Sequence, residues 1–390
     1  MGFEALTEYL DSLGQTYGVP GLDFKIMKEH QPIYRHMTGY SDYVGKRRVV
    51  GNELYDLYSC TKVVTMTAVM QLVEQGKLGL NDPLSKYLPE FAHMQVADHF
   101  DLPANGWPDE NTPTHPAEKP ILIHQLMSMT AGLSYDTGAA PLRALAARNP
   151  FATTREMVAE MAKMPLLFEP GTHWSYALCH DVLAAVIEVV SGETFGEYLK
   201  RHIFRPLGMK DAYMQFPPEE RYRQAAQYTD TPELKIGPTP LTNSYRLTSF
   251  YESGGAGLTA SLDSYLLLLD ALSCGGMGAT GYRVLTPESV AEMSRSHLEG
   301  EPLEDFRKFG RTGYSYGLGV RVLVDQSAAE SPVGEFGWDG AAGAYGLIDP
   351  VNHVSFFYTQ QILNMGRVYF EIHPHLRDLV YKELKAQGIV

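Results

Sequence analysis

The sequence Ser59-Cys60-Thr61-Lys62 runs directly into an apolar stretch, residues 63–73, whose composition predicts a buried helix. Ser59 and Lys62 stand three residues apart, so on a helix their side chains share one face, one turn apart. A lysine in the first turn of so apolar a helix must find polar partners or lose its proton. Beside a serine hydroxyl, such a lysine indicates an activated nucleophile. A four-residue pattern also occurs by chance, and in the alternative interpretation Lys62 simply extends into solvent. A catalytic role for Ser59 and Lys62 therefore needs partner residues elsewhere in the chain.

The composition narrows the class of protein. The chain has 390 residues, 44% of them apolar, and a net charge of −14 without a basic cluster, which argues against binding to nucleic acid or to anionic membranes. No apolar run approaches the ~18 residues of a membrane-spanning helix. The N-terminus is acidic and lacks the basic region of a signal peptide, and the three cysteines form no disulfide framework, so we expect a cytoplasmic protein.

Hydrophobic periodicity and turn residues predict an α+β order of elements. A helix over residues 3–17 is followed by strands at 22–28 and 33–39 and then by the Ser59 helix. Residues 90–120 are rich in Pro, Asp and His and read as a surface loop, and residues 121–250 as mostly helical. Further predicted helices cover 124–131, 154–164, 180–190, 195–203 and 372–386, and further strands cover 317–324 and 353–359. The expected division is a sheet region of residues 1–58 and 251–390, with an inserted helical region, 59–250, that carries Ser59 and Tyr176.

Two later segments supply partners for the serine. Tyr176-Ala177-Leu178 lies just before a predicted helix, and Trp338-Asp339-Gly340 leads into Ala341 in a glycine-rich segment. With Ser59-x-x-Lys62, this ordered series resembles the serine β-lactamase and penicillin-binding-protein superfamily, whose motifs are Ser-x-x-Lys, Tyr-x-Asn and Lys-Thr-Gly or a variant. The similarity is greatest to the class C-like branch, and above all to the family VIII carboxylesterases. It covers nearly the whole chain and includes segments 79–83, 126–133, 206–209 and 254–258.

The resemblance implies a β-lactamase/transpeptidase-like α/β fold, in which helices flank an antiparallel sheet built from both chain ends. It also implies that Ser59 is acylated, that Lys62 polarises the site and that Tyr176 acts as general base and then as acid. The backbone N–H groups of Ser59 and Ala341 would form the oxyanion hole. A nearby lysine ammonium would favour the Tyr176 phenolate, and whether Lys62 or Tyr176 takes the serine proton stays open.

The third and second motifs depart from the pattern of lactam-handling relatives. Leu178 stands where those relatives carry an asparagine that binds the substrate amide, so a peptide-like ligand would lose a hydrogen bond worth about 1 kcal/mol. Trp338 replaces the cation that recognises a carboxylate, and Asp339 is expected to add negative charge that repels anions. With Gly340, these residues form the expected substrate pocket. We therefore expect a carboxylesterase acting on small neutral esters, with weak or absent β-lactam hydrolysis and no cofactor or metal.

Several alternatives remain open. Gly313-Tyr314-Ser315-Tyr316-Gly317 matches a Gly-x-Ser-x-Gly elbow, but a strand follows it where that motif needs a helix. Groups that could bind metal, His93 with Asp98 and His99, and His373 with His375, lack zinc-enzyme spacing. Cys60 and Cys179 are interpreted as packing residues. An acyltransferase, a D-aminopeptidase or D,D-peptidase, and a non-catalytic scaffold of the same fold are the rival functions. The sequence predicts neither the natural ester nor the oligomeric state.

Overall fold

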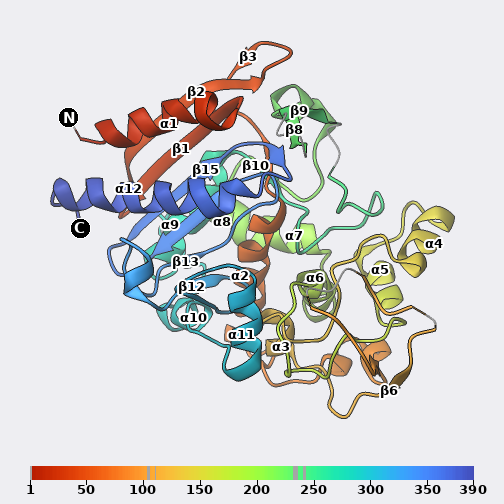
Figure 1. Ribbon diagram of the computed structural model, residues 1–390. Helices are drawn as coiled ribbons and strands as arrows, with labels where there is room; N and C mark the ends of the chain where they lie inside the picture. The colour runs from red at the N-terminus through yellow and green to blue at the C-terminus, as the bar shows by residue number, and fades with distance from the viewer. Residues whose placement is uncertain (1, 103–105, 110, 232–235, 240–242) are drawn as a thin grey trace.

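An antiparallel sheet of eight strands forms one half of the protein in the computed structural model, which describes residues 2–102, 106–109, 111–231, 236–239 and 243–390 (Figure 1). Its strand order is β11-β12-β13-β14-β15-β1-β2-β3. β1 pairs with β15 antiparallel, with Asp23 opposite Thr359, so the two chain ends meet in the middle of the sheet. This confirms the predicted antiparallel sheet built from both ends. The strands are β1 (Gly21–Lys28), β2 (Gln31–Asp42), β3 (Arg47–Arg48), β11 (Tyr314–Tyr316), β12 (Arg321–Leu323), β13 (Phe336–Gly337), β14 (Tyr345–Asp349) and β15 (Val354–Thr359).

Helices cover both faces of this sheet. α1 (Glu4–Tyr17) and α12 (His373–Ala386) lie side by side on one face, and α9 (Leu262–Ser273) packs against β15 and β14 on the other (Figure 1). Successive residues of a strand point to opposite faces. Accordingly Phe356 packs in the cluster under α1 and α12, whereas Phe357 packs in the cluster that contains α9. α1 ends at Gly18, which adopts the left-handed conformation with φ 76° that a helix C-terminus favours.

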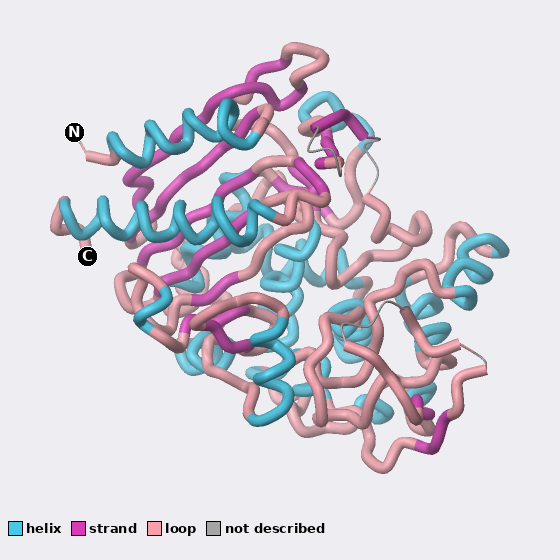
Figure 2. The backbone as a smooth tube through the Cα atoms, in the orientation of Figure 1, coloured by secondary structure: helices cyan, strands magenta, loops and turns pink. Residues whose placement is uncertain are grey.

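The second half of the protein consists of helices joined by long loops and is built around α2 (Thr61–Glu74) (Figure 2). Every residue of α2 from Thr61 to Leu72 is buried, so this helix is enclosed on all sides as its composition predicts. α6 (Cys179–Ser191) packs directly against it. The remaining helices are α3 (Ile123–Met127), α4 (Ala140–Arg148), α5 (Thr154–Met161), α7 (Phe195–Leu199), α8 (Arg205–Leu207), α10 (Pro287–Met293) and α11 (Gly300–Lys308). No described helix combines the length and apolarity that crossing a bilayer requires.

The structure differs from the sequence-based expectation in two segments. Residues 208–250 were expected to be helical, but among the described ones they contain short strands and one short 3₁₀ helix, Pro218–Arg223. Residues 90–120 were expected to be an irregular loop, but they contain the paired strands β5 and β6. Within these two segments, residues 103–105, 110, 232–235 and 240–242 lie outside the described residues. The division into 1–58 plus 251–390 and 59–250 stays a prediction. The short strands are β4 (Tyr55–Asp56), β5 (Gln95–Ala97), β6 (Thr114–Pro116), β7 (Ala212–Tyr213), β8 (Gln227–Asp230), β9 (Ile236–Thr239), β10 (Thr259–Ala260) and β16 (Ile362–Leu363).

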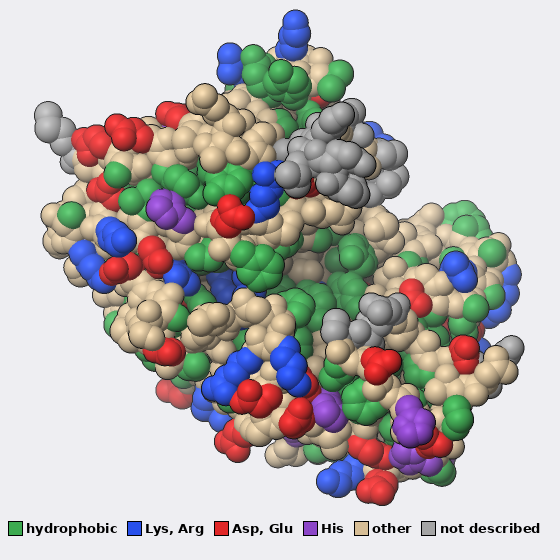
Figure 3. Space-filling view, viewed as in Figure 1, with side chains coloured by type: hydrophobic (Ala, Val, Ile, Leu, Met, Phe, Trp, Pro, Cys, Tyr) green, Lys and Arg blue, Asp and Glu red, His purple; other side chains and the backbone are tan. Residues whose placement is uncertain are grey.

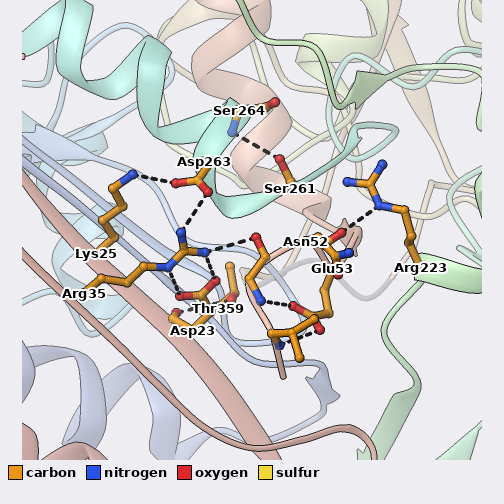
Figure 4. Close-up of polar contacts among 12 residues, drawn as sticks. Asp23, Lys25, Arg35, Asn52, Glu53, Arg223, Ser261, Asp263, Ser264 and Thr359 are labelled. Carbon is orange, nitrogen blue, oxygen red and sulfur yellow. Dashed lines mark hydrogen bonds and ion pairs between the residues drawn. The ribbon is translucent and has the colours of Figure 1, made fainter. Parts of the chain in front are cut away.

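A network of ion pairs ties the β1–β2 hairpin to α9 (Figure 4). The Arg35 guanidinium of β2 contacts Asp23 of β1 at 2.8 Å and Asp263 of α9 at 2.9 Å. Lys25 Nζ donates to the same Asp263 carboxylate at 2.6 Å. Because Asp23 is 1% exposed, its charge needs this guanidinium to compensate the cost of burial. The network therefore joins the first and the last third of the chain at one point of the sheet.

Candidate active site

Ser59 occupies a strained turn at the start of α2. It lies in the single 3₁₀ turn Tyr58–Cys60 that precedes the helix, and Tyr58 adopts φ 46°, a left-handed conformation that is unusual for an aromatic residue. Neighbouring segments fix the turn: the Tyr265 hydroxyl donates to Cys60 O at 2.8 Å, and Leu57 N donates to Leu258 O at 2.9 Å. The turn thus presents Ser59, which is half-buried, at a defined place beside α2.

Lys62 is fully buried and directed at Ser59. Its Nζ donates to Gly255 O at 2.8 Å and lies 3.3 Å from Ser59 Oγ. The Tyr135 hydroxyl is 3.4 Å from the same nitrogen, which also lies 4.6 Å from the centroid of the Tyr176 ring. The alternative in which Lys62 extends into solvent is therefore wrong, because the helix that carries it is enclosed by the core.

Tyr176 stands in a stack of aromatic rings between Lys62 and the sheet. Its ring is nearly parallel to that of Tyr135, with centroids 4.9 Å apart, and to that of Trp338, with centroids 5.8 Å apart. Trp338 Nε1 donates a hydrogen bond of 3.1 Å to the Tyr176 hydroxyl. Phe309 stacks on the same ring with centroids 5.8 Å apart. The stack fixes the Tyr176 hydroxyl and surrounds it with apolar surface.

Burial sets the protonation states of this group. It lowers the pKa of Lys62 from 10.5 to about 7, and the Asp181 carboxylate offsets part of that shift. Burial also raises the pKa of Tyr176 well above its usual range, although hydrogen bonds to Ser59 and Trp338 act in the opposite direction. The expectation that a lysine ammonium would favour the Tyr176 phenolate is therefore wrong, since desolvation outweighs it. Near pH 7 the arrangement favours a neutral phenol and a lysine that readily loses its proton.

The segment of the third motif passes directly beside the Ser59 turn. A Cβ at Gly340 would lie 2.4 Å from the backbone oxygen of Leu57, so only glycine allows this approach. Cys60 Sγ contacts Trp338 O at 3.6 Å. Ala341 follows in a tight turn that is closed by a bond from Gly343 N to Gly340 O of 2.9 Å. The predicted site residues thus form a chain of contacts, from Ser59 to Lys62, from Lys62 to Tyr176 and from Tyr176 to Trp338, with Gly340 and Ala341 on the adjoining turn.

All four expected pocket residues are buried, and two of them, Asp339 and Leu178, take positions that differ from the expectation. Asp339 was expected to repel anions, but its carboxylate is 4% exposed and is neutralised by Arg321 at 2.8 Å and by a close contact with Arg311. The guanidinium groups of Arg311 and Arg321 hold the pKa of Asp339 below its usual value despite burial. Leu178 is 1% exposed in the hydrophobic core, where its backbone N donates to Ser134 O at 3.0 Å.

We expect Asp339→Ala to destabilise the protein strongly. The change leaves the fully buried Arg321 guanidinium without its carboxylate, which typically costs about 3–5 kcal/mol of unfolding free energy. The thermal unfolding midpoint, followed by circular dichroism, should drop by several degrees. Glu197→Gln, which removes one partner of the exposed Lys200 pair at 3.1 Å, is the control and should leave the midpoint nearly unchanged. Equal midpoints for the two variants would contradict this assignment.

The other candidate residues from the sequence take structural positions. Ser315 is 1% exposed within β11 and shares a hydrogen bond of 2.7 Å with Ser296, and Cys60 and Cys179 are buried. His373 stacks on Tyr345 with centroids 4.4 Å apart. His93 and His99 are exposed, and Asp98 pairs with His115.

Two groups of side chains in the described residues could offer three ligand atoms each to a metal ion: His30, Asp270 and Cys274, and His173, Glu301 and Asp305. In both groups the histidine Nδ1 already bonds the aspartate, at 2.6 Å and 2.8 Å.

Sequence reasoning missed two residues of the site, Tyr135 and Asp181. Tyr135 follows the segment 126–133, and its role becomes visible only when the chain brings its ring onto Tyr176. Asp181 is the first acidic residue of α6 and is fully buried, so an acid in an otherwise apolar run was the available signal. A buried carboxylate beside a buried lysine is the kind of pairing that tunes protonation at functional sites.

Comparison with known proteins agrees with this geometry. The chain is 28% identical over 349 residues to Esterase EstB of Burkholderia gladioli, with 83% of this chain and 81% of that protein covered. It is 30% identical over 348 residues to the lovastatin esterase of Penicillium rubens, with 81% and 83% covered. Its structure superimposes on EstCE1, described as a hydrolase with promiscuous acyltransferase activity, with a TM-score of 0.78, 26% identity, and 96% and 97% covered. The Beta-lactamase family profile matches residues 6–375, nearly the full length, and this chain is therefore a hydrolase of the beta-lactamase family.

Proposed function

We propose that this protein is a serine carboxylesterase that cleaves small, uncharged esters through a covalent acyl-Ser59 intermediate. The observation that carries the proposal is the contact of a fully buried Lys62 with Ser59 Oγ at 3.3 Å, beside a Tyr176 hydroxyl that Trp338 holds in place. A buried amine with a pKa of about 7 is matched to proton transfer at neutral pH.

The proposed reaction has two steps. The neutral Lys62 amine takes the proton of Ser59 as Oγ forms a bond to the ester carbonyl carbon, and the N–H groups of Ser59 and Ala341 receive the oxyanion. As the carbon–oxygen bond to the alcohol breaks, the Tyr176 phenol protonates the leaving oxygen and regains a proton from the Lys62 ammonium. Water then attacks the acyl-serine and gives a proton to Lys62. As the bond between the acyl carbon and Oγ breaks, the Lys62 ammonium returns that proton to Oγ, which releases the acid and leaves free Ser59 and neutral Lys62.

The walls of the site support an apolar substrate. Tyr135, Trp338 and Phe309 surround Tyr176, and the molecular surface is hollowed between the sheet and the helical half, near α2 and α6, where hydrophobic side chains predominate (Figure 3). The charge of Asp339 is neutralised within the fold, so the preference for neutral esters rests on the aromatic walls and on Trp338 in place of a cation.

β-Lactam hydrolysis is expected to be slow. Leu178 offers no side-chain amide to a lactam substituent, and Trp338 offers no charge to the lactam carboxylate. We expect kcat/KM for nitrocefin to be at least about a hundredfold below that for p-nitrophenyl butyrate, as two missing polar contacts imply. Initial rates for the two chromogenic substrates measure this ratio, and comparable values would contradict the proposed substrate class.

Hydrolysis and acyl transfer share the acyl-enzyme and differ in the acceptor that resolves it. The similarity to EstCE1 makes transfer the second candidate. Turnover of p-nitrophenyl butyrate in the presence of a primary alcohol separates the two, because the ratio of free butyrate to the butyrate ester of that alcohol reports how the intermediate partitions. Butyrate as the main product at millimolar alcohol is the result expected of an esterase, and ester as the main product would identify a transferase. Absence of any turnover would refute both.

A further inference from the structure

A second buried charged group lies close to Lys62. Asp181 sits in the first turn of α6 and is fully buried. Its Oδ1 accepts hydrogen bonds of 2.6 Å from both the Tyr251 and the Ser253 hydroxyl groups. No side chain among the described residues donates a hydrogen bond to its Oδ2, although the backbone N–H of Gly255 also stabilises the carboxylate. A buried carboxylate oxygen with so little hydrogen bonding is costly, and a nearby positive charge would offset that cost.

The free oxygen of Asp181 borders the Lys62 ammonium across Gly255. A Cβ built on Gly255 would lie 2.7 Å from Asp181 Oδ2 and 3.3 Å from Lys62 Nζ. The two atoms are therefore within about 6 Å of each other, the range in which one charge shifts the pKa of another. Lys62 also donates to Gly255 O at 2.8 Å, so the glycine backbone fills the space between the two groups. Any side chain at this position would push them apart.

The packing of the glycine segment fixes this arrangement. A Cβ on Gly254 would lie 2.1 Å from the backbone oxygen of His180, so residues 254–255 rest directly on the first turn of α6. Ser253 Oγ, besides donating to Asp181, accepts from Ala256 N at 2.9 Å. Asp181 and Lys62 thus belong to two buried helices that are joined through one rigid segment.

We infer that Asp181 is a positioning residue of the site, whose carboxylate holds Lys62 in place behind Ser59 and governs how readily Lys62 carries a proton. The effect of Asp181 on turnover rests on the proposed function, whereas its effect on the protonation of Lys62 does not. The other titratable groups that face Lys62 or Asp181 are Cys60, Tyr135, Tyr176, Cys179, His180, Tyr245 and Tyr251. Burial raises the pKa of the thiols and phenols and lowers that of His180, so all of them are neutral near pH 7. Burial also raises the pKa of Asp181, but the hydrogen bonds from Ser253 and Tyr251 and the charge of Lys62 act in the opposite direction. Among these groups Asp181 is the one we infer to supply negative charge to Lys62.

The negative charge of Asp181 sets the direction in which its removal should shift the pKa of Lys62. A carboxylate favours the ammonium form, so replacing it with an amide should lower the pKa of Lys62. In the proposed mechanism, kcat/KM falls on the acid side as Lys62 gains a proton. We therefore expect Asp181→Asn to move the acid limb of the pH profile for p-nitrophenyl butyrate to lower pH by about one unit or more. A residue with only a structural role would lower stability or activity at every pH and leave the limb in place.

The matched control is Asp270→Asn. Asp270 is also fully buried in a helix, α9, and accepts hydrogen bonds from His30, so its amide variant imposes a comparable structural change away from Lys62. We expect it to leave the acid limb where it is. An unshifted limb in Asp181→Asn, or an equal shift in both variants, would overturn the assignment.

Direct titration separates this inference from the proposed function. With lysine labelled by ¹³C at Cε, the NMR shift of Lys62 reports its protonation without any substrate, and its midpoint should be lower in Asp181→Asn than in wild type. If that variant does not fold, the ¹³C shift of the Asp181 carboxyl group in wild type provides the test. An ionised carboxylate at pH 7 that responds to the Lys62 titration supports the role, and a protonated carboxyl group at pH 7 overturns it. A wild type that titrates as expected but hydrolyses no ester would refute the proposed function alone.

Discussion

Replacing Ser59 with alanine is expected to reduce kcat/KM for p-nitrophenyl butyrate by on the order of 10⁴ or more, because the variant has no atom that can form the acyl bond. Ser59 is half-buried in a turn that neighbouring segments hold through their backbone, and alanine fits that turn. The free energy of unfolding should therefore change little. Steady-state kinetics measures the loss of activity, and thermal unfolding measures the change in stability.

Ser315→Ala is the matched control for the nucleophile. Ser315 belongs to the rival Gly-x-Ser-x-Gly segment, but it is 1% exposed in β11 and bonds Ser296. We expect its alanine variant to retain activity close to that of wild type. Loss of activity in Ser315→Ala together with an active Ser59→Ala would reverse the assignment.

Tyr176→Phe should give the second-largest loss, about 10²–10⁴ in kcat/KM, the range typical of a missing general acid. The variant keeps the ring that stacks between Tyr135 and Trp338 and removes only the hydroxyl that Trp338 Nε1 holds at 3.1 Å. Stability should fall by only about 1 kcal/mol, the value of one neutral hydrogen bond. A large loss of activity with a small loss of stability would therefore point to chemistry and not to packing.

Tyr135→Phe tests whether the loss is specific to Tyr176. Tyr135 also presents a hydroxyl to Lys62, at 3.4 Å, but no hydrogen bond from Trp338 orients it. We expect its phenylalanine variant to lose about tenfold or less, as one neutral hydrogen bond implies. Substrates whose leaving groups differ in pKa distinguish the two variants further, because loss of a general acid lowers kcat/KM most for poor leaving groups. A larger loss in Tyr135→Phe than in Tyr176→Phe would exchange the two roles.

Local pattern predicted the elements that carry the site. The enclosed helix after Ser59 follows from an apolar run with one lysine, and the sheet built from both chain ends follows from strand patterns near each terminus. The spacing of Ser59 and Lys62 also predicted their contact, since residues three apart on a helix face each other. These features depend on short-range periodicity, which the sequence shows directly.

The features that escaped prediction depend on contacts between distant residues. Asp339 reads as a free negative charge, and only the fold brings Arg311 and Arg321 to it. The pKa of Lys62 and that of Tyr176 depend on how deeply both are buried, so the sequence-based argument from charge alone had the wrong sign. Residues 208–250 lack a clear hydrophobic period. Their strand β7 pairs with the distant β10, and β8 pairs with its neighbour β9 and with the distant β16.

Intact-protein mass spectrometry after reaction with a fluorophosphonate tests the central claim most directly. We expect one phosphonyl adduct on the wild-type protein, none on Ser59→Ala, and one on Ser315→Ala, with the label mapped to the peptide that contains residues 59–62. An adduct that persists in Ser59→Ala, or a wild-type protein that takes no label while folded, would contradict a nucleophilic Ser59.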